Sequence, residues 1–407
     1  MLKRTISLFA AAVLTLGLAG CNMVIKDEEK ASQVVVAKVG ETEITRAQVD
    51  AEYDVLLASY ASYGLSTSDI DADTERSFKE SILDDMVAYE TMVQNAPDGL
   101  GVAALTDDEL KEIDDQIEST IKSYEEYLTE NAEGDTDEEK QQYVEESLAQ
   151  VKETLGYDSG VMKNQQIRST YLQKVKDAIG ENYTPSDEEI QTKYDSMLSE
   201  QKEAVTEDMS AFSDYAGQDN QVYIPAGVHY VQNLLIEIPS DARTEISQIE
   251  DETEKEQRKQ EELAKIKDEA DEALKKAQAD GADFAKLLDE YSDDPGSTSE
   301  PTRTEGYAVW EGNTTYVSEF TDAAMALTKT GEISGLVESD YGYHILRLVK
   351  VTEEGSVPLE DVKETITTTL TEEYISSEYD SKLEEYKKAS NVTEYKDKLE
   401  ITASSSS

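Results

Sequence analysis

Residues 331–348 read GEISGLVESDYGYHILRL and predict a turn, a strand, a second turn and a closing strand. Upstream, residues 230–238 read YVQNLLIEI, with apolar residues on both faces, which is typical of a central strand. Three helical patterns lie between them, at residues 250–279, from residue 281 to Tyr291, and at residues 320–327. Residues 227–352 therefore predict a small α+β domain with an antiparallel sheet.

The chain before this domain predicts a different architecture. A β-branched strand at residues 34–40 leads into amphipathic helices that continue to about residue 200. Capping-box patterns at Thr106 and Ser186 mark two helix starts, and residues 132–140 read as a solvated connection. We expect residues 33–200 to form a helical domain, separated from the α+β domain by a linker at residues 201–226, which show no clean period.

The chain after the α+β domain predicts one long helix or a pair of helices over residues 359–399. Four apolar residues spaced by four form a stripe that must be buried, namely Val362, Ile366, Leu370 and Tyr374. We expect residues 359–400 to complete the helical domain and the Ser-rich tail at 401–407 to be disordered.

The first 21 residues predict export and a lipid anchor. Lys3 and Arg4 precede an apolar run from Ile6 to Leu18 that is too short to span a membrane comfortably. Residues 18–21 read LAGC and match the lipobox of bacterial lipoproteins, which predicts a signal peptide at 1–20 and acyl chains on Cys21. The alternative is an ordinary secretory signal with a chance cysteine. The lipobox reading places the chain on the extracytoplasmic face of a bacterial membrane, with residues 21–32 as a polar tether.

Charge and composition exclude several classes of function. The formal net charge is −53 and becomes −55 after loss of Lys3 and Arg4 (−53 minus 2), so nucleic-acid binding is not expected. With two histidines and one cysteine, the usual ligands of a zinc site are missing. No cofactor is expected. Calcium on an acidic loop stays open, although the sequence contains no EF-hand spacing.

Several blocks in order resemble the parvulin-type prolyl isomerases. Residues 281–294 read GADFAKLLDEYSDD, residues 319–324 read EFTDAA, and the stretch at 331–348 follows. Outside this domain, VVAKVGETEITRAQVD at 35–50 and PSDEEIQTKYD at 185–195 are similar to PrsA- and SurA-type foldases. Across most of the chain, the resemblance implies a helical chaperone-like domain and a peptidyl-prolyl cis-trans isomerase that acts on unfolded or nascent exported polypeptides.

The resemblance also implies roles for individual residues. In the family, two facing histidines and a nearby Cys or Asp form a polar network under a pocket for the proline ring. His344 matches the second histidine and Asp294 matches the Cys/Asp position. Phe320 matches a pocket aromatic, and Met325 and Tyr316 align with other substrate-binding positions. No metal is implied.

The sequence departs from the family pattern at three places. Asn233 stands where the first histidine is expected, and His229 lies four residues earlier, about 13 Å away along a strand. The glycine-rich loop is reduced to RTEG at 303–306, and the helix after the first strand is long. Asn233 both donates and accepts hydrogen bonds, so an altered network is possible.

Three functional hypotheses follow. The first is an anchored foldase with isomerase activity, and the second is a non-catalytic holdase whose isomerase domain is degenerate because of Asn233. The third is a surface lipoprotein that binds solutes or cell wall, against which the isomerase-like blocks argue. Each site residue also has an ordinary structural explanation: His344 as a histidine of a closing strand, Asp294 as a turn residue before Pro295, and Phe320 and Met325 as core residues.

Overall fold

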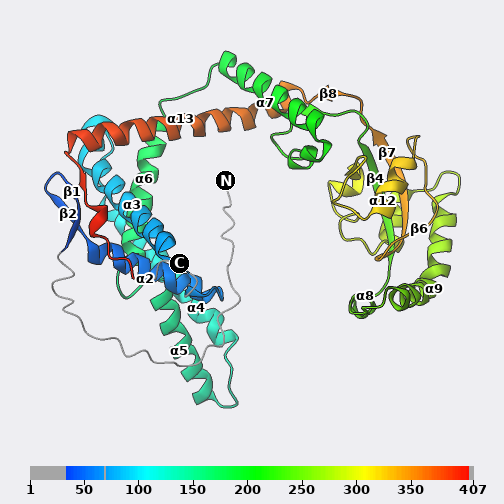
Figure 1. Cartoon of the computed structure of the whole chain (residues 1–407), viewed down its shortest axis with the longest axis horizontal. Helices are drawn as coiled ribbons and strands as arrows, with labels where there is room; N and C mark the ends of the chain where they lie inside the picture. Colours follow the sequence, from blue (N-terminus) through cyan, green and yellow to red (C-terminus); the bar gives the residue numbers. More distant parts are fainter. Residues whose placement is uncertain (1–33, 68–69, 403–407) are drawn as a thin grey trace. The chain divides into compact units, whose positions relative to one another are not determined.

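The computed structural model describes residues 34–67 and 70–402 and forms two compact units. The first unit consists of the chain up to Thr184 together with residues from Thr371 onward, and the second unit runs from Pro185 to Leu370. Figure 1 labels the helices and strands of both units. The signal peptide and Cys21 fall outside the described residues. Among the described residues, no helix is long and apolar enough to cross a membrane.

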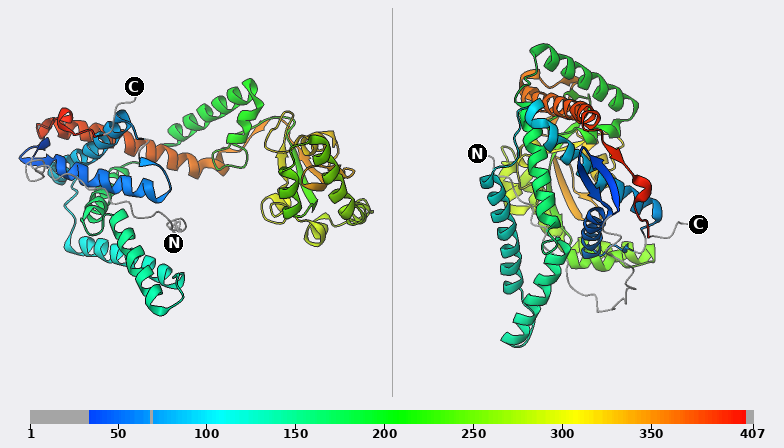
Figure 2. Two further views of the ribbon diagram at one scale, coloured as in Figure 1. Left: turned by 60° about the horizontal axis from the view of Figure 1, so that its bottom comes forward. Right: turned by 90° about the vertical axis from the view of Figure 1, so that its left-hand side faces the viewer.

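The first unit combines helices with a three-stranded sheet in the order β2-β1-β9. Its strands are β1 (Val35–Val39), β2 (Thr42–Thr45) and β9 (Thr393–Glu394), followed by the short helix η3 (Lys396–Lys398). Its helices are α2 (Arg46–Ser62), α3 (Ala72–Gly99), α4 (Asp107–Glu130), α5 (Asp137–Thr154) and α6 (Val161–Gly180). Figure 2 shows α4 and α5 running beside each other as a hairpin.

The C-terminal segment is an integral part of this first unit. Strand β9 pairs antiparallel with β1, and the backbone N–H of Tyr395 donates to the carbonyl of Val36 at 2.7 Å. Leu399 is buried among the apolar side chains of β1 and α3, such as Val36 and Leu83. Two ends of the chain that are more than 300 residues apart in sequence therefore share one core.

The predicted α+β domain is confirmed in the second unit. Its sheet has the order β5-β4-β7-β6 and all its pairs are antiparallel. The strands are β4 (His229–Glu237), β5 (Tyr307–Val309), β6 (Val337–Glu338) and β7 (Gly342–Val351). The helices are α8 (Ser240–Ser247), α9 (Glu252–Ala277), α10 (Phe284–Tyr291), α11 (Thr302–Glu305) and α12 (Ser318–Ala326). As expected from its two apolar faces, β4 is an interior strand.

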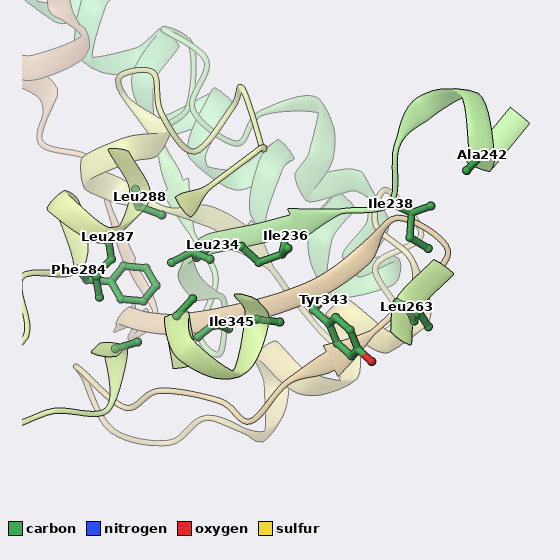
Figure 3. Close-up of a cluster of buried hydrophobic side chains, with 13 residues drawn as sticks. Leu234, Ile236, Ile238, Ala242, Leu263, Phe284, Leu287, Leu288, Tyr343 and Ile345 are labelled. Carbon is green, nitrogen blue, oxygen red and sulfur yellow. The ribbon is translucent and has the colours of Figure 1, made fainter. Parts of the chain in front are cut away.

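Side chains alternate across this sheet and build two separate cores. Figure 3 shows the first core, where Leu234, Ile236 and Ile345 from the strands meet Phe284 and Leu287 from α10. On the opposite face, Val231, Leu346 and Leu348 pack with residues of α12. The candidate site lies on this second face, under α12.

The predicted linker at residues 201–226 is instead folded. Helix α7 (Asp187–Glu207) extends into this range and is followed by η2 (Met209–Asp214) and β3 (Tyr223–Ile224), which pairs with β8 (Gly355–Ser356). Phe212 is fully buried, and its ring meets Trp310 edge to face at 5.4 Å between centroids. Because a 3₁₀ helix and a two-residue strand have no common period, a pattern search does not detect them.

Two further expectations can be compared with the structure. The capping boxes at Thr106 and Ser186 are confirmed, but a third one at Thr136 starts α5 at Asp137, inside the range expected to be a connection. Helix α13 (Leu359–Ala389) is continuous, and the predicted apolar stripe is divided between the units. Val362 and Ile366 are buried in the second unit, whereas Tyr374 packs in the first.

Candidate functional site

The pairing of β4 with β7 brings Asn233 and His344 together. Asn233 pairs with Leu346 and His344 pairs with Leu235, so the two polar residues are diagonal neighbours on one face of the sheet. At that diagonal spacing long side chains can reach each other. His344 Nδ1 lies 3.0 Å from Asn233 Oδ1, and both residues are buried. Asn233 thus faces His344 from the position at which the resemblance places the first of the two histidines.

The hydrogen-bond directions in this pair follow from their partners. Asn233 Nδ2 donates to Asp294 Oδ2 at 2.8 Å, so its Oδ1 faces His344 and can only accept. His344 Nδ1 must therefore carry a proton and donate to Asn233. Its Nε2 lies 2.8 Å from Ser339 Oγ and accepts from that hydroxyl when the imidazole is neutral. The network fixes one tautomer of His344.

The Asp294 carboxylate anchors the other end of the network. It accepts from Asn233 Nδ2, from the Tyr307 hydroxyl at 2.8 Å and from the backbone N–H of Gly296 at 3.0 Å. Burial first, and the bond to Asp294 second, raise the pKa of Tyr307, so its hydroxyl stays protonated and donates. A Cβ on Gly296 would lie 2.1 Å from the Tyr307 hydroxyl oxygen, so glycine is required for this approach.

Ser339 and Tyr307 are site residues that the sequence did not predict. Ser339 Oγ bonds to His344 and also accepts from the backbone N–H of Tyr341 at 3.0 Å. Serine, histidine and asparagine in this order are reminiscent of nucleophilic triads. However, Ser339 is only 1% exposed, so its hydroxyl cannot reach a substrate carbonyl. Ser339 holds the ring of His344 rather than acting as a nucleophile.

Aromatic side chains cover this polar network. The Phe320 ring meets the His344 ring edge to face at 5.5 Å, and Tyr316 lies 5.2 Å from Phe320 between centroids. Tyr307 contacts both rings. Met325 is half-buried at the edge of the same apolar cluster. The three predicted polar residues and two of the three predicted apolar ones are thus directly connected.

Gly306, the remnant of the glycine-rich loop, lets the chain approach the backbone of β4 closely. Its φ is +83°, and a Cβ there would lie 2.8–2.9 Å from backbone atoms of Val231. The adjacent Tyr307 pairs with Val231 in the sheet. Glycine at 306 therefore allows the close approach that places the Tyr307 hydroxyl next to Asp294.

Burial controls the charge of His344. Desolvation lowers its pKa from 6.5 to about 4, although the negative charges of Asp294 and Glu319 act in the opposite direction. The imidazole is therefore neutral at pH 7, which agrees with the tautomer that the hydrogen bonds require. No proton needs to be exchanged with solvent for the network to stay intact near neutrality.

We expect acid to destabilise the second unit through His344. The unfolded state binds a proton near pH 6.5 and the folded state only near pH 4, so stability falls as the pH decreases between these values. The two pKa values differ by about 2.5, which corresponds to roughly 3 kcal/mol at about 1.4 kcal/mol per pH unit. Urea unfolding followed by the fluorescence of Trp310, the one tryptophan, would measure the difference between wild type and His344→Gln at pH 7 and pH 4. Parallel pH dependences of the two proteins would contradict the expectation.

Comparison with known proteins agrees with this geometry. Residues 242–350 match the family model of the PPIC-type PPIase domain, and residues 3–135 match the SurA-like N-terminal domain. The foldase protein PrsA of Clostridium kluyveri is 27% identical over 389 residues, which cover 94% of each chain. The PrsA proteins of Clostridium botulinum (strain Langeland) and Clostridium perfringens (strain ATCC 13124) are each 25% identical, and 98% of this chain is covered.

The chain is therefore similar to PrsA foldases along nearly its whole length. It carries a parvulin-type peptidyl-prolyl isomerase domain in its second unit and a SurA-like domain in its first. In this PrsA-like chain the match to the isomerase family includes Asp294 and His344 but begins after Asn233. The geometry of β4 is therefore what connects Asn233 with the other two residues.

Proposed function

We propose that this chain is a foldase of exported proteins whose isomerase domain is catalytic despite Asn233. The observation that carries the proposal is the continuous network from Ser339 through His344 and Asn233 to Asp294, with the ring of Phe320 against His344. The side chain of Asn233 hydrogen-bonds to both His344 and Asp294, so the network is continuous at the position where the family histidine is missing. The substrates are unfolded or nascent exported polypeptides with X-Pro bonds.

Prolyl isomerisation needs binding of a twisted bond and no covalent step. The barrier to rotation is about 18–20 kcal/mol and arises from amide resonance. Twisting removes this resonance and reduces the negative charge on the carbonyl oxygen. A carboxylate near that oxygen therefore disfavours the planar form relative to the twisted one, which accelerates rotation. We assign this electrostatic role to Asp294, and the holding of the proline ring to Phe320, Tyr316 and Met325.

His344 and Asn233 hold the charge of Asp294 in a fixed position. Each of them has its hydrogen-bonding atoms occupied by partners within the network. Such a preorganised group does not need to reorient as the substrate bond twists. The test is protease-coupled turnover of an X-Pro peptide by the whole chain. The expected result is a rate that rises in proportion to protein concentration, and absence of any rate above background would refute the isomerase proposal.

A holdase function is the second candidate, and the replacement of a family histidine by Asn233 favours it. A holdase suppresses aggregation of an unfolded client without changing the rate of isomerisation. The His344→Ala variant separates the two functions, because it removes a member of the network and leaves the first unit unchanged. Full suppression of aggregation by a wild type without isomerase activity would support the holdase alone.

We also propose that the chain is anchored to the outer face of the membrane through Cys21. The supporting observation is the LAGC sequence at residues 18–21 after an apolar run. Two or three acyl chains anchor a protein durably, whereas one chain does so marginally. In a bacterial host, the protein is expected in the membrane fraction, with diacylglycerol on the N-terminal Cys21 peptide by mass spectrometry. The Cys21→Ser variant should lose both properties, and its retention in the membrane would contradict anchoring.

A further inference from the structure

His229, the second histidine of the chain, has no role in the network around Asp294. It lies at the start of β4, four residues before Asn233, which is about 13 Å along the strand. It shares the face of the sheet that carries Asn233 and is only 9% exposed. Its Nδ1 lies 3.0 Å from the backbone carbonyl oxygen of Ala324. A carbonyl oxygen only accepts, so His229 Nδ1 carries a proton and donates to it.

This hydrogen bond ties α12 to the sheet. Ala324 belongs to the last turn of α12, where carbonyl groups lack the usual partner four residues later in the helix. Apart from His229, the Ala324 carbonyl accepts a long hydrogen bond from the backbone N–H of Leu327, at 3.2 Å. The contacts of α12 with Val231 and Leu346 of the sheet are apolar, and the Phe320 ring packs against the His344 ring. Apolar contacts are not directional and tolerate small shifts of a helix, whereas a hydrogen bond to one carbonyl selects one position.

The same helix carries the ring that covers the catalytic network. Phe320 lies one turn before Ala324, about 6 Å along the axis and on the same side of the helix. Its ring is buried against Tyr316 and His344. A shift of α12 relative to β4 would therefore move Phe320 relative to His344.

The geometry points to His229 as a positioning residue of the proline-binding wall, acting through the Ala324 carbonyl on the placement of Phe320. The inference rests on the proposed isomerase function and adds a residue that touches neither the substrate nor the network. The wall holds the proline ring in both the planar and the twisted form of the bond. Its displacement therefore weakens substrate binding and leaves the chemical step nearly unchanged, in contrast to changes at Asp294.

Two substitutions at His229 distinguish a positioning role from packing alone. His229→Leu fills the space and removes the donor, whereas His229→Asn retains a donor, Nδ2, at the same number of bonds from Cα as His229 Nδ1. We expect His229→Leu to raise KM for an X-Pro peptide about fivefold with kcat within about twofold, and His229→Asn to restore KM to within about twofold of wild type. Urea unfolding followed by Trp310 fluorescence verifies that both variants are fully folded in the assay.

A nuclear magnetic resonance measurement supplies a readout that does not depend on turnover. The Phe320 ring shifts the resonances of the His344 ring protons, and His229→Leu should change these shifts while His229→Asn should not. An unchanged KM and unchanged His344 shifts in His229→Leu would overturn the inference, as would equal effects of the two variants. If the wild type has no turnover, the proposed isomerase function fails, and the His344 shifts alone then decide whether His229 positions the wall.

Discussion

Replacing Asp294 by asparagine is expected to lower kcat for X-Pro isomerisation about 100-fold, the loss typical of removing one preorganised electrostatic group from an active site. The neighbouring substitution Asp293→Asn should leave kcat within about twofold. The two aspartates are adjacent in sequence and differ in their partners. Asp294 accepts from Asn233, Tyr307 and Gly296, whereas Asp293 accepts from the backbone N–H of Glu237 at 3.0 Å.

The physical reason is the number of acceptors that an amide offers. The Asp294 carboxylate receives three donors with two oxygens, and an asparagine has one oxygen and an NH₂ group that can only donate. One donor of the network would then face another donor, and the negative charge that we assign to catalysis would be lost. Asp293→Asn changes the same charge and volume one residue away and is therefore a matched control.

The measurement is the protease-coupled assay on both variants at pH 7. Trp310 fluorescence in urea checks that each variant is folded, because disruption of a buried network also destabilises the domain. Equal rates for Asp294→Asn and wild type would remove Asp294 from the mechanism. A loss of similar size in His344→Ala would show that the histidine and the carboxylate act as one unit. Removing either member of such a network disrupts the function of the whole network.

Much of the isomerase domain could be predicted because its residues obey simple periods. The apolar residues on both faces of 230–238 and the apolar residues of 343–348 predict strands, and the facing of Asn233 and His344 follows once these strands pair antiparallel in the observed register. The resemblance to the family supplied the match of Asn233 to a histidine position. The register itself could not be derived from the pattern, and a shift of one strand by one residue would place Asn233 and His344 on opposite faces of the sheet.

Ser339 and Tyr307 could not be predicted for a different reason. Both lie in segments without a regular period, and their partners are determined by backbone turns. The approach of Tyr307 to Asp294 needs glycine at both 296 and 306, for two separate steric reasons. The glycine that remains in RTEG at 303–306 is a hint of such a close approach. A single glycine, however, does not indicate which neighbouring group approaches the backbone there.

The C-terminal segment was the least predictable part of the first unit. Strand β9 has two residues and η3 has three, which are too short for any periodic signal. Their positions depend on partners far away in the sequence: β9 pairs with Ala37 and Lys38 of β1, and Lys396 Nζ of η3 lies 2.7 Å from Asp84 Oδ1. The sequence predicts that residues 359–400 complete the helical domain, but no pattern in residues 391–402 indicates that β9 pairs with β1.

Ending the chain at Ser390 is expected to destabilise the first unit by at least about 4 kcal/mol, since removing a buried leucine alone costs about 2–5 kcal/mol. The truncation removes β9 and with it one neighbour of β1. It also removes Leu399 from the core and opens the site where Lys79 Nζ donates to the Glu400 carbonyl at 2.8 Å. The Thr402 backbone N–H, which donates to the buried Glu75 carboxylate at 2.8 Å, is lost as well.

The second unit should be unaffected, because none of the removed residues belongs to it. Far-ultraviolet circular dichroism is therefore expected to show an early loss of helix on heating, while Trp310 fluorescence keeps its wild-type urea midpoint and the isomerase rate per molecule is unchanged. A chain that ends at Thr402 retains all of these contacts and serves as the control. If the chain ending at Ser390 unfolds like this control, the C-terminal segment does not contribute to the core of the first unit. If Trp310 fluorescence and isomerase activity fall together with the helix signal, the two units do not unfold independently, since the only tryptophan and the Asp294 network both lie in the second unit.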